Sequence, residues 1–135
     1  MASNEADDTI ILPPKGGRAY ALGTMSALFL ADEAETNAAY SISEWALAPK
    51  SVGPGKHAHE AHDDIFYVLE GVMTFWVRDR WLEAPAGSFV RVGKGVEHDY
   101  RNDGEVPARM LNIYIPGGFE REMPAIVDWF AKQGG

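Results

Sequence analysis

The sequence predicts an all-β fold, a small antiparallel sandwich or barrel that ends in a single helix. Segments rich in β-branched and aromatic residues are short and alternate with Gly, Pro and Asp, as strands joined by tight turns do. The last segment, 124–133, instead spaces Ile126, Val127 and Phe130 at helical intervals, with Pro124 at its start and two glycines after it. Short strands followed by one helix indicate an antiparallel architecture. The 135 residues suffice for one domain and not for two.

The order of the elements follows from the turn signals along the chain. Residues 1–17, which contain a Pro-Pro and a Gly-Gly pair, are expected to form a mobile N-terminal segment ahead of a domain at 18–135. We interpret the acidic stretch Asp32–Asn37 as a solvated turn and Arg78–Arg80 as a hairpin turn. The expected strands are Arg18–Leu22, Met25–Leu30, Tyr40–Leu47, Ile65–Leu69, Val72–Val77, Phe89–Val92, Asp99–Arg101 and Arg109–Ile115.

The composition excludes several classes of function. The formal net charge is −8 and no Lys/Arg cluster interrupts this acidity, so we expect no binding to nucleic acid. No apolar stretch approaches the roughly 20 residues of a membrane helix, and the acidic N-terminus has no signal-peptide pattern, so no membrane contact is expected. Cysteine is absent, which excludes disulfides and thiolate ligands and suits a cytoplasmic protein.

Three of the four histidines fall into a pattern that predicts a metal site. His57 and His59 are one residue apart, so on a strand their side chains would point to the same face. Asp64 would come from the next strand and His98 from a more distant one. Neutral imidazoles and a carboxylate that converge on one point suit a divalent first-row metal: Fe, Mn, Co, Ni or Zn. The predicted ligands of this one ion are His57, His59, Asp64 and His98.

Two motifs make the chain resemble the cupin superfamily. The first motif, His-x-His, four residues, an acidic residue, six residues and Gly, is met by His57, His59, Asp64 and Gly71. The second motif follows after fifteen residues, a gap typical of compact single-domain bacterial cupins. Its positions are Gly87, Gly93, Gly95, His98 and Asn102, of which Asn102 is expected to anchor a turn through its amide. Segments at Glu35–Glu44 and Pro116–Glu120 also look like the quercetin-dioxygenase-like branch of this superfamily.

The resemblance implies a fold, a cofactor and an activity. The fold would be the double-stranded β-helix of cupins, a jelly-roll barrel, and one divalent transition metal would be held by the ligands named above. The activity would be that of a metal-dependent dioxygenase, an oxidoreductase acting on a small aromatic or enolic compound. Asp64 would then be the catalytic residue, as the fourth ligand or as a proton acceptor. Cupins of this size commonly dimerise through their strands, so a homodimer is expected.

Asp64 is also where the chain departs from the family, whose first motif usually has Glu. Asp is shorter by one methylene, about 1.5 Å of reach. Either the strand lies closer to the ion, or a water fills the gap, or three histidines hold the metal alone. The other departure, Gly93 in place of Pro, falls at a turn, where Gly supports a tight bend.

Four further residues are candidates for the substrate pocket. Strand alternation from two of the ligands turns Phe66, Val68 and Tyr100 inward. Inward apolar residues are also ordinary core, so both interpretations of these three remain open. His62 lies in the loop between the ligand-bearing segments, where we expect it to be exposed or to line the entrance. A swing of that loop would instead bring His62 to the metal.

Two other functions fit the same residues. A metal-assisted isomerase, cyclase or lyase would use the same donors without O₂, and turnover in the absence of O₂ would favour it. A non-catalytic module that binds or senses a small ligand would be favoured by a pocket full of large apolar side chains with no open metal position. One scaffold hosts many functions, so the fold alone does not decide among the three.

Overall fold

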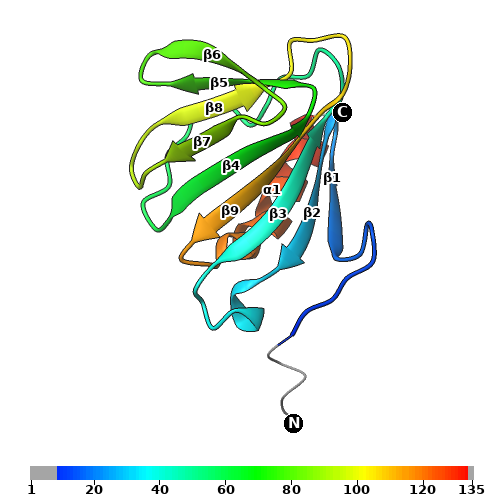
Figure 1. Cartoon of the computed structure of the whole chain (residues 1–135), viewed down its shortest axis with the longest axis vertical. Helices are drawn as coiled ribbons and strands as arrows, with labels where there is room; N and C mark the ends of the chain where they lie inside the picture. Colours follow the sequence, from blue (N-terminus) through cyan, green and yellow to red (C-terminus); the bar gives the residue numbers. More distant parts are fainter. Residues whose placement is uncertain (1–8, 134–135) are drawn as a thin grey trace.

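A computed structural model describes residues 9–133, which form two antiparallel sheets and a C-terminal helix (Figure 1). The larger sheet has the strand order β1-β2-β3-β9-β4-β7, and the smaller has the order β6-β5-β8. Helix α1 (Met123–Gln133) follows a short 3₁₀ helix, η3 (Phe119–Glu122), and lies behind β3 and β9 in Figure 1. The other elements are β1 (Arg18–Leu22), β2 (Met25–Ala31), η2 (Glu33–Glu35), β3 (Ser41–Leu47), β4 (Asp63–Glu70), β5 (Val72–Val77), β6 (Arg80–Pro85), β7 (Phe89–Val92), β8 (His98–Arg101) and β9 (Ala108–Ile115).

The expected all-β class, the antiparallel pairing, the two-sheet architecture and the terminal helix are confirmed, and in the described part of the chain the two sheets do not join into a closed barrel. Within the described residues, β1 and β7 are the edge strands of the larger sheet, and β6 and β8 are those of the smaller. No strand pairing among these residues joins one sheet to the other. Strand β6 was not expected from the sequence. The turn before it is Arg78–Asp79, with φ of 54° and 67°, so Arg80 begins a strand instead of completing the turn.

The acidic stretch lies at the surface as expected, but its charges are paired. Arg18 on β1 lies 3.1 Å from Asp32 and 2.6 Å from Glu35, at either end of η2. Glu33 pairs with Arg121 of η3. These ion pairs join η2 to β1 and to η3, although exposed pairs contribute little to stability.

Strand alternation places the core between the two sheets. Every second residue of β2, β3 and β9 is buried. Phe29 stacks on Tyr114 with ring centroids 6.1 Å apart, and Tyr114 stacks on Phe119 at 4.7 Å. This stack attaches η3 to the inner face of the larger sheet. The core includes Leu22, Met25, Phe29, Trp45, Leu47, Phe66, Val68, Met73, Phe75, Tyr100, Met110, Tyr114 and Met123.

Part of the N-terminal segment lies outside the described residues, namely 1–8. Residues 10–15 run along the outer face of β2 and β3, where Ile10 and Leu12 line a groove together with Leu28 and Leu30. The mobility of the segment stays a prediction. Between residues 9 and 133, the structure has no helix of the length and hydrophobicity needed to cross a membrane.

Asn102 anchors the end of β8 to two neighbouring loops, as its place in the sequence predicted. Its amide nitrogen donates to the carbonyl oxygens of Leu47 at 3.3 Å, Ala48 at 3.1 Å and Val106 at 2.8 Å. Its Oδ1 accepts the N–H of Gly104 at 2.9 Å. The side chain is fully buried, so water cannot replace these partners.

Replacing Asn102 by Ala should lower the free energy of unfolding by about 2–4 kcal/mol, because several buried backbone groups lose their hydrogen-bond partner. Urea denaturation would measure the change. The control is Asp103→Ala, which removes only an exposed pair with Arg101 and should cost about 0.5 kcal/mol or less. Equal losses in the two variants would contradict the anchoring role.

Candidate metal centre

A cavity of about 480 Å³ opens at one end of the core. Strands of both sheets form its inner wall, and η3 and α1 contribute Phe119, Ile126, Trp129 and Phe130 to the opposite side. Polar side chains gather at its inner wall, in contrast to the apolar core around them. They are His57, His59, His62, Asp64, His98 and Asn112.

The loop before β4 is held against β8, and the strand expected to carry His57 and His59 is not formed. Gly and Pro just before His57 disfavour a regular strand. His57 and His98 instead make an isolated bridge, with N–H···O distances of 3.0 and 2.8 Å. The N–H of Gly55 donates to Oδ1 of Asp99 at 3.1 Å. Two residues of β8 therefore position the loop, and the ring centroids of His57 and His98 lie 4.4 Å apart.

Backbone carbonyls orient two of the imidazoles. Nδ1 of His57 donates to the carbonyl of Gly55 at 2.7 Å, and Nδ1 of His98 donates to that of Val96 at 2.9 Å. A carbonyl can only accept, so each neutral ring carries its proton on Nδ1 and leaves a free lone pair on Nε2. Metal-ligating histidines commonly have this arrangement.

His59 is positioned by the turn that leads into β8. Its carbonyl accepts the N–H of Gly95 at 2.8 Å, and Gly95 has the left-handed φ of 77° that favours glycine. Ring nitrogens of His57, His59 and His98 lie within 4.8 Å of one another. The structure thus brings together the three histidines that the sequence singled out, from one loop and one strand.

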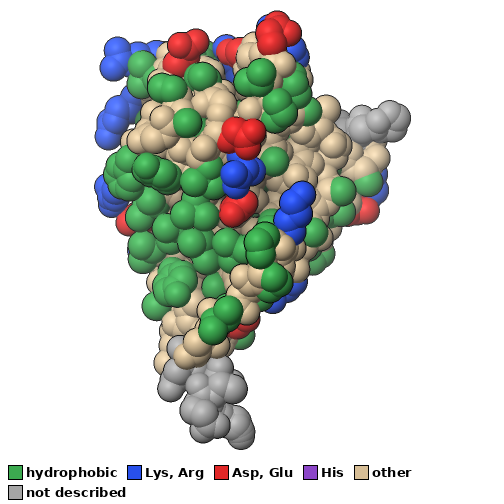
Figure 2. Space-filling view, turned by 45° about the vertical axis from the view of Figure 1, so that its right-hand side comes forward, with side chains coloured by type: hydrophobic (Ala, Val, Ile, Leu, Met, Phe, Trp, Pro, Cys, Tyr) green, Lys and Arg blue, Asp and Glu red, His purple; other side chains and the backbone are tan. Residues whose placement is uncertain are grey.

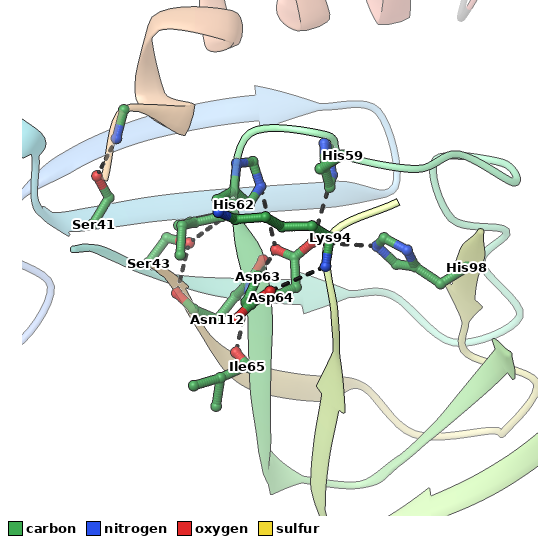
Figure 3. A network of polar contacts seen from close by, with 12 residues as sticks. Ser41, Ser43, His59, His62, Asp63, Asp64, Ile65, Lys94, His98 and Asn112 are labelled. Carbon is green, nitrogen blue, oxygen red and sulfur yellow. Dashed lines mark hydrogen bonds and ion pairs between the residues drawn. The ribbon is translucent and has the colours of Figure 1, made fainter. Parts of the chain in front are cut away.

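Asp64 projects from β4 into the same space and is 2% exposed. Its Oδ2 lies 3.4 Å from Nε2 of His98 and 3.7 Å from Nε2 of His59 (Figure 3). Two atoms bonded to one ion at about 2.1 Å are roughly 3 Å apart at a right angle and about 4 Å apart when opposite. Asp64 therefore lies at ligand spacing from two of the three histidines, whereas the set of ring nitrogens within 4.8 Å of one another comprises His57, His59 and His98. A direct bond from Asp64 to the same ion stays a proposal. Asn112 donates to Oδ1 of Asp64 at 3.3 Å.

His62 lines the cavity and is not exposed: 8% of its side chain is accessible. Its ring stacks on that of His59, with centroids 4.5 Å apart. Its Nε2 lies 3.7 Å from Oδ1 of Asp64. The edges of Tyr114 and Phe119 enclose the ring at 5.3 and 5.7 Å. His62 is thus packed beside the other polar groups.

The three inward residues proposed from strand alternation are all buried. Phe66 and Tyr100 belong to the core and also line the cavity. Val68 is a core residue and is not among the described residues that line the cavity. A role in substrate binding stays a proposal for Phe66 and Tyr100.

Sequence reasoning missed Asn112 and the cover formed by η3 and α1. Asn112 had a signal, because it is a polar residue at an inward position of an otherwise apolar strand, between Met110 and Tyr114. No sequence signal predicted that α1 docks across the cavity, since helical periodicity shows which face of a helix is apolar but not what that face covers.

Burial keeps three of the imidazoles neutral. It lowers the pKa of His59 from 6.5 to about 4, against the attraction of Asp64. Burial also lowers the pKa of His57 and of His62. For His98, burial opposes the charged form, but the contacts with Asp64 and the Val96 carbonyl outweigh it and raise the pKa. Neutral imidazoles beside a carboxylate are the form that binds a divalent transition metal, so the donor set fits such an ion.

The lowered pKa of His59 predicts a pH-dependent stability of the metal-free protein. Between pH 6.5 and about 4 the unfolded chain binds a proton at His59 and the folded chain does not, so acid lowers the free energy of unfolding there. His59→Gln should therefore lose less stability than the wild type when the pH falls from 6.5 to 4.5, as measured by thermal unfolding in chelator.

His98→Gln is the control of opposite sign. The raised pKa of His98 contributes stability below pH 6.5, which is lost as the pH rises through the folded value, so this variant should lose that acid-side stabilisation. If the free energy of unfolding changed with pH in the same way in the wild type and both variants, the opposite pKa shifts of His59 and His98 would be contradicted.

Comparison with known proteins agrees with the motifs. Residues 43–114 match the cupin domain family. Over 64 residues the chain is 38% identical to the quercetin 2,3-dioxygenase of Bacillus subtilis (strain 168), a match that covers 47% of this chain and 19% of that protein. The chain thus spans about a fifth of the length of this relative.

Solved structures show the same fold. The structure of a polyketide cyclase from Streptomyces resistomycificus has a TM-score of 0.69 and 19% identity, with 79% of each chain covered. A Thermotoga maritima protein described as a predicted oxalate decarboxylase has a TM-score of 0.65 and 22% identity, over 68% of this chain and 80% of that one. The family match extends over more than half of the 135 residues, and the chain belongs to the cupin domain family.

Proposed function

We propose that the chain is a metal-dependent cupin enzyme of the oxygenase type, acting on a small aromatic or enolic compound. The observation that carries the proposal is the convergence of three imidazoles inside an aromatic-walled cavity, with the Asp64 carboxylate beside two of them. The resemblance to part of a quercetin 2,3-dioxygenase supports the choice of substrate class. Bound there by His57, His59, His98 and Asp64, a divalent ion would supply a Lewis acid and a template for the reacting partners.

The walls of the cavity suit a flat, largely apolar substrate. Trp45 Nε1 donates to the hydroxyls of Ser43 and Tyr114, at 3.0 and 3.1 Å. These polar atoms are therefore satisfied within the protein, and the rings present apolar surface to the cavity. Burial raises the pKa of the Tyr114 hydroxyl, so it stays protonated. Trp129 of α1 also lines the cavity, where it can cover an aromatic substrate.

Asp64 would accept a proton from the substrate. Its Oδ2 faces the imidazoles, and Asn112 fixes its Oδ1 at 3.3 Å, so the carboxylate has a defined orientation. Burial excludes water from this group. A carboxylate held in this way is a usable base when a substrate proton comes within hydrogen-bond reach.

The alternative is a metal-assisted isomerase, cyclase or lyase on the same residues. Its donors and its base would be the same, and only the need for O₂ distinguishes it. A non-catalytic binding module is the third hypothesis, in which the loaded protein binds a flavonol without converting it.

The proposed function is tested by metal content and oxygen uptake. Untagged protein is loaded separately with each of the five metals. It should bind one ion per chain, and the form loaded with the native metal should consume O₂ with a flavonol. Asp64→Asn should retain most of the metal and lower turnover about 100-fold or more, because general-base catalysis contributes roughly 10²–10⁴.

Asp63→Asn is the matched control for this test. Asp63 is the neighbouring carboxylate, but it faces outward and pairs with Arg91 and the N–H of Lys94, so turnover should persist. Conversion of the flavonol without O₂ would favour the metal-assisted isomerase, cyclase or lyase over the oxygenase. Binding without conversion would favour the binding module, and wild-type turnover in Asp64→Asn would make Asp64 a bystander.

We also propose that two copies of the chain associate through the outward face of the larger sheet. Ile42, Ile113 and Ile65 form a row across β3, β9 and β4 on this face. Tyr67 and Phe89 lie opposite each other on β4 and β7 and are 45% and 64% exposed. Figure 2 shows hydrophobic side chains gathered over a broad area on this side of the molecule.

A second copy suits this face because its charges are nearly balanced although the chain carries −8. Arg109 lies 3.0 Å from Glu44 and 3.3 Å from Glu70, and Arg91 pairs with Asp63. Two copies can therefore meet here without the repulsion expected from their net charge. Exposed apolar patches of this kind mark interaction surfaces.

Light scattering coupled to gel filtration should give twice the chain mass of 14.8 kDa for the wild type. Tyr67→Glu/Phe89→Glu should shift the mass to that of one chain, because charges would be buried at the contact. Leu82→Glu, at a 47% exposed position on the smaller sheet, is the control and should stay dimeric. A wild-type mass equal to that of one chain would contradict the proposed dimer.

A further inference from the structure

A second group of donors lies beside the first and shares one histidine with it. His59, His62 and Asp64 each offer one ligand atom, and these atoms lie within 4.8 Å of one another. We propose that this second set is an alternative binding position for a divalent transition metal, which takes the ion when the first set, His57, His59 and His98, does not hold it. The inference goes beyond the proposed function, in which His62 has no role.

An unpartnered atom points to a ligand at this position. Nε2 of His62 is buried and has no hydrogen-bond partner among the described residues. Buried polar atoms in folded proteins nearly always have one. The facing oxygen, Oδ1 of Asp64, is 3.7 Å away, too far for a hydrogen bond and within the spacing of two atoms bonded to one ion.

The ring of His62 is already in place for this role. It is stacked on His59 and enclosed by the edges of Tyr114 and Phe119. The hydroxyl of Tyr114 is engaged with Ser43 at 3.0 Å, so it does not serve His62. His62 and Asp64 would need to move only slightly toward each other to bind one ion, whereas the sequence suggested a swing of the whole loop.

The two sets would hold the ion alternately, because both include His59 and their donor atoms lie too close together for two divalent cations to be bound side by side without strong repulsion. Asp64 can serve either set, since its Oδ2 faces His59 and His98 while its Oδ1 faces His62 (Figure 3). The ion can therefore exchange His57 and His98 for His62 without leaving His59 and Asp64.

Calorimetric titration of the untagged chain with Co(II) tests the second set. His57→Ala/His98→Ala retains only the second set and should still bind one ion, more weakly than the wild type. Adding His62→Ala should weaken this binding at least about 100-fold, because loss of even an indirect partner of a ligand costs roughly 10–100-fold. If the double Ala variant loses its circular dichroism signal, His57→Gln/His98→Gln, which conserves volume, replaces it.

Glu60→Ala in the same double background is the control, since Glu60 lines the cavity but belongs to neither set, and binding should persist. A double variant that is folded but binds no Co(II), or a triple variant that binds as tightly as the double, would overturn the second set. Wild-type loading and oxygen uptake are measured on the same preparations. If the wild type binds metal and consumes O₂ but the variants show no binding at the second set, only the second set is overturned. If the wild type binds no metal, both the second set and the proposed function are overturned.

Discussion

Two backbone hydrogen bonds between His57 and His98 are the constraint on which the site depends. They join an irregular loop to the first residue of β8, and so convert a sequence separation of some forty residues into adjacent imidazoles. The Gly55 carbonyl, fixed through Asp99, then sets the tautomer of His57. Orientation by backbone groups is less easily lost than orientation by side chains, because it survives most substitutions nearby.

The electrostatics of the cavity centre on one carboxylate among four imidazoles. A buried carboxylate is costly without compensating partners, and three imidazoles lie within 4 Å of the buried Asp64. In the metal-free chain His98 is the first of the four to be protonated, since its pKa is raised and those of the other three are lowered. A divalent ion would displace this proton and supply the same compensation more strongly, which makes metal affinity dependent on pH.

Most of the fold and the donor set could be predicted from the sequence, because strand alternation and ligand spacing are local signals. Eight strands, the helix and the inward side of Phe66 and Tyr100 follow from such patterns. Strand β6 could not be predicted, since Glu83 and a closing proline interrupt its apolar residues. The loop conformation at His57 and the cover by α1 depend on long-range contacts, which no local period encodes.

The substitution of Asp for Glu at position 64 and the presence of His62 can be understood together. A Glu carboxylate would extend about 1.5 Å further into the cavity, away from the inner wall where Asn112 holds Oδ1. The shorter Asp64 keeps one oxygen at 3.4 Å from His98 and the other at 3.7 Å from His62. The shorter carboxylate thus stays beside the inner wall, where each of its oxygens faces a buried imidazole.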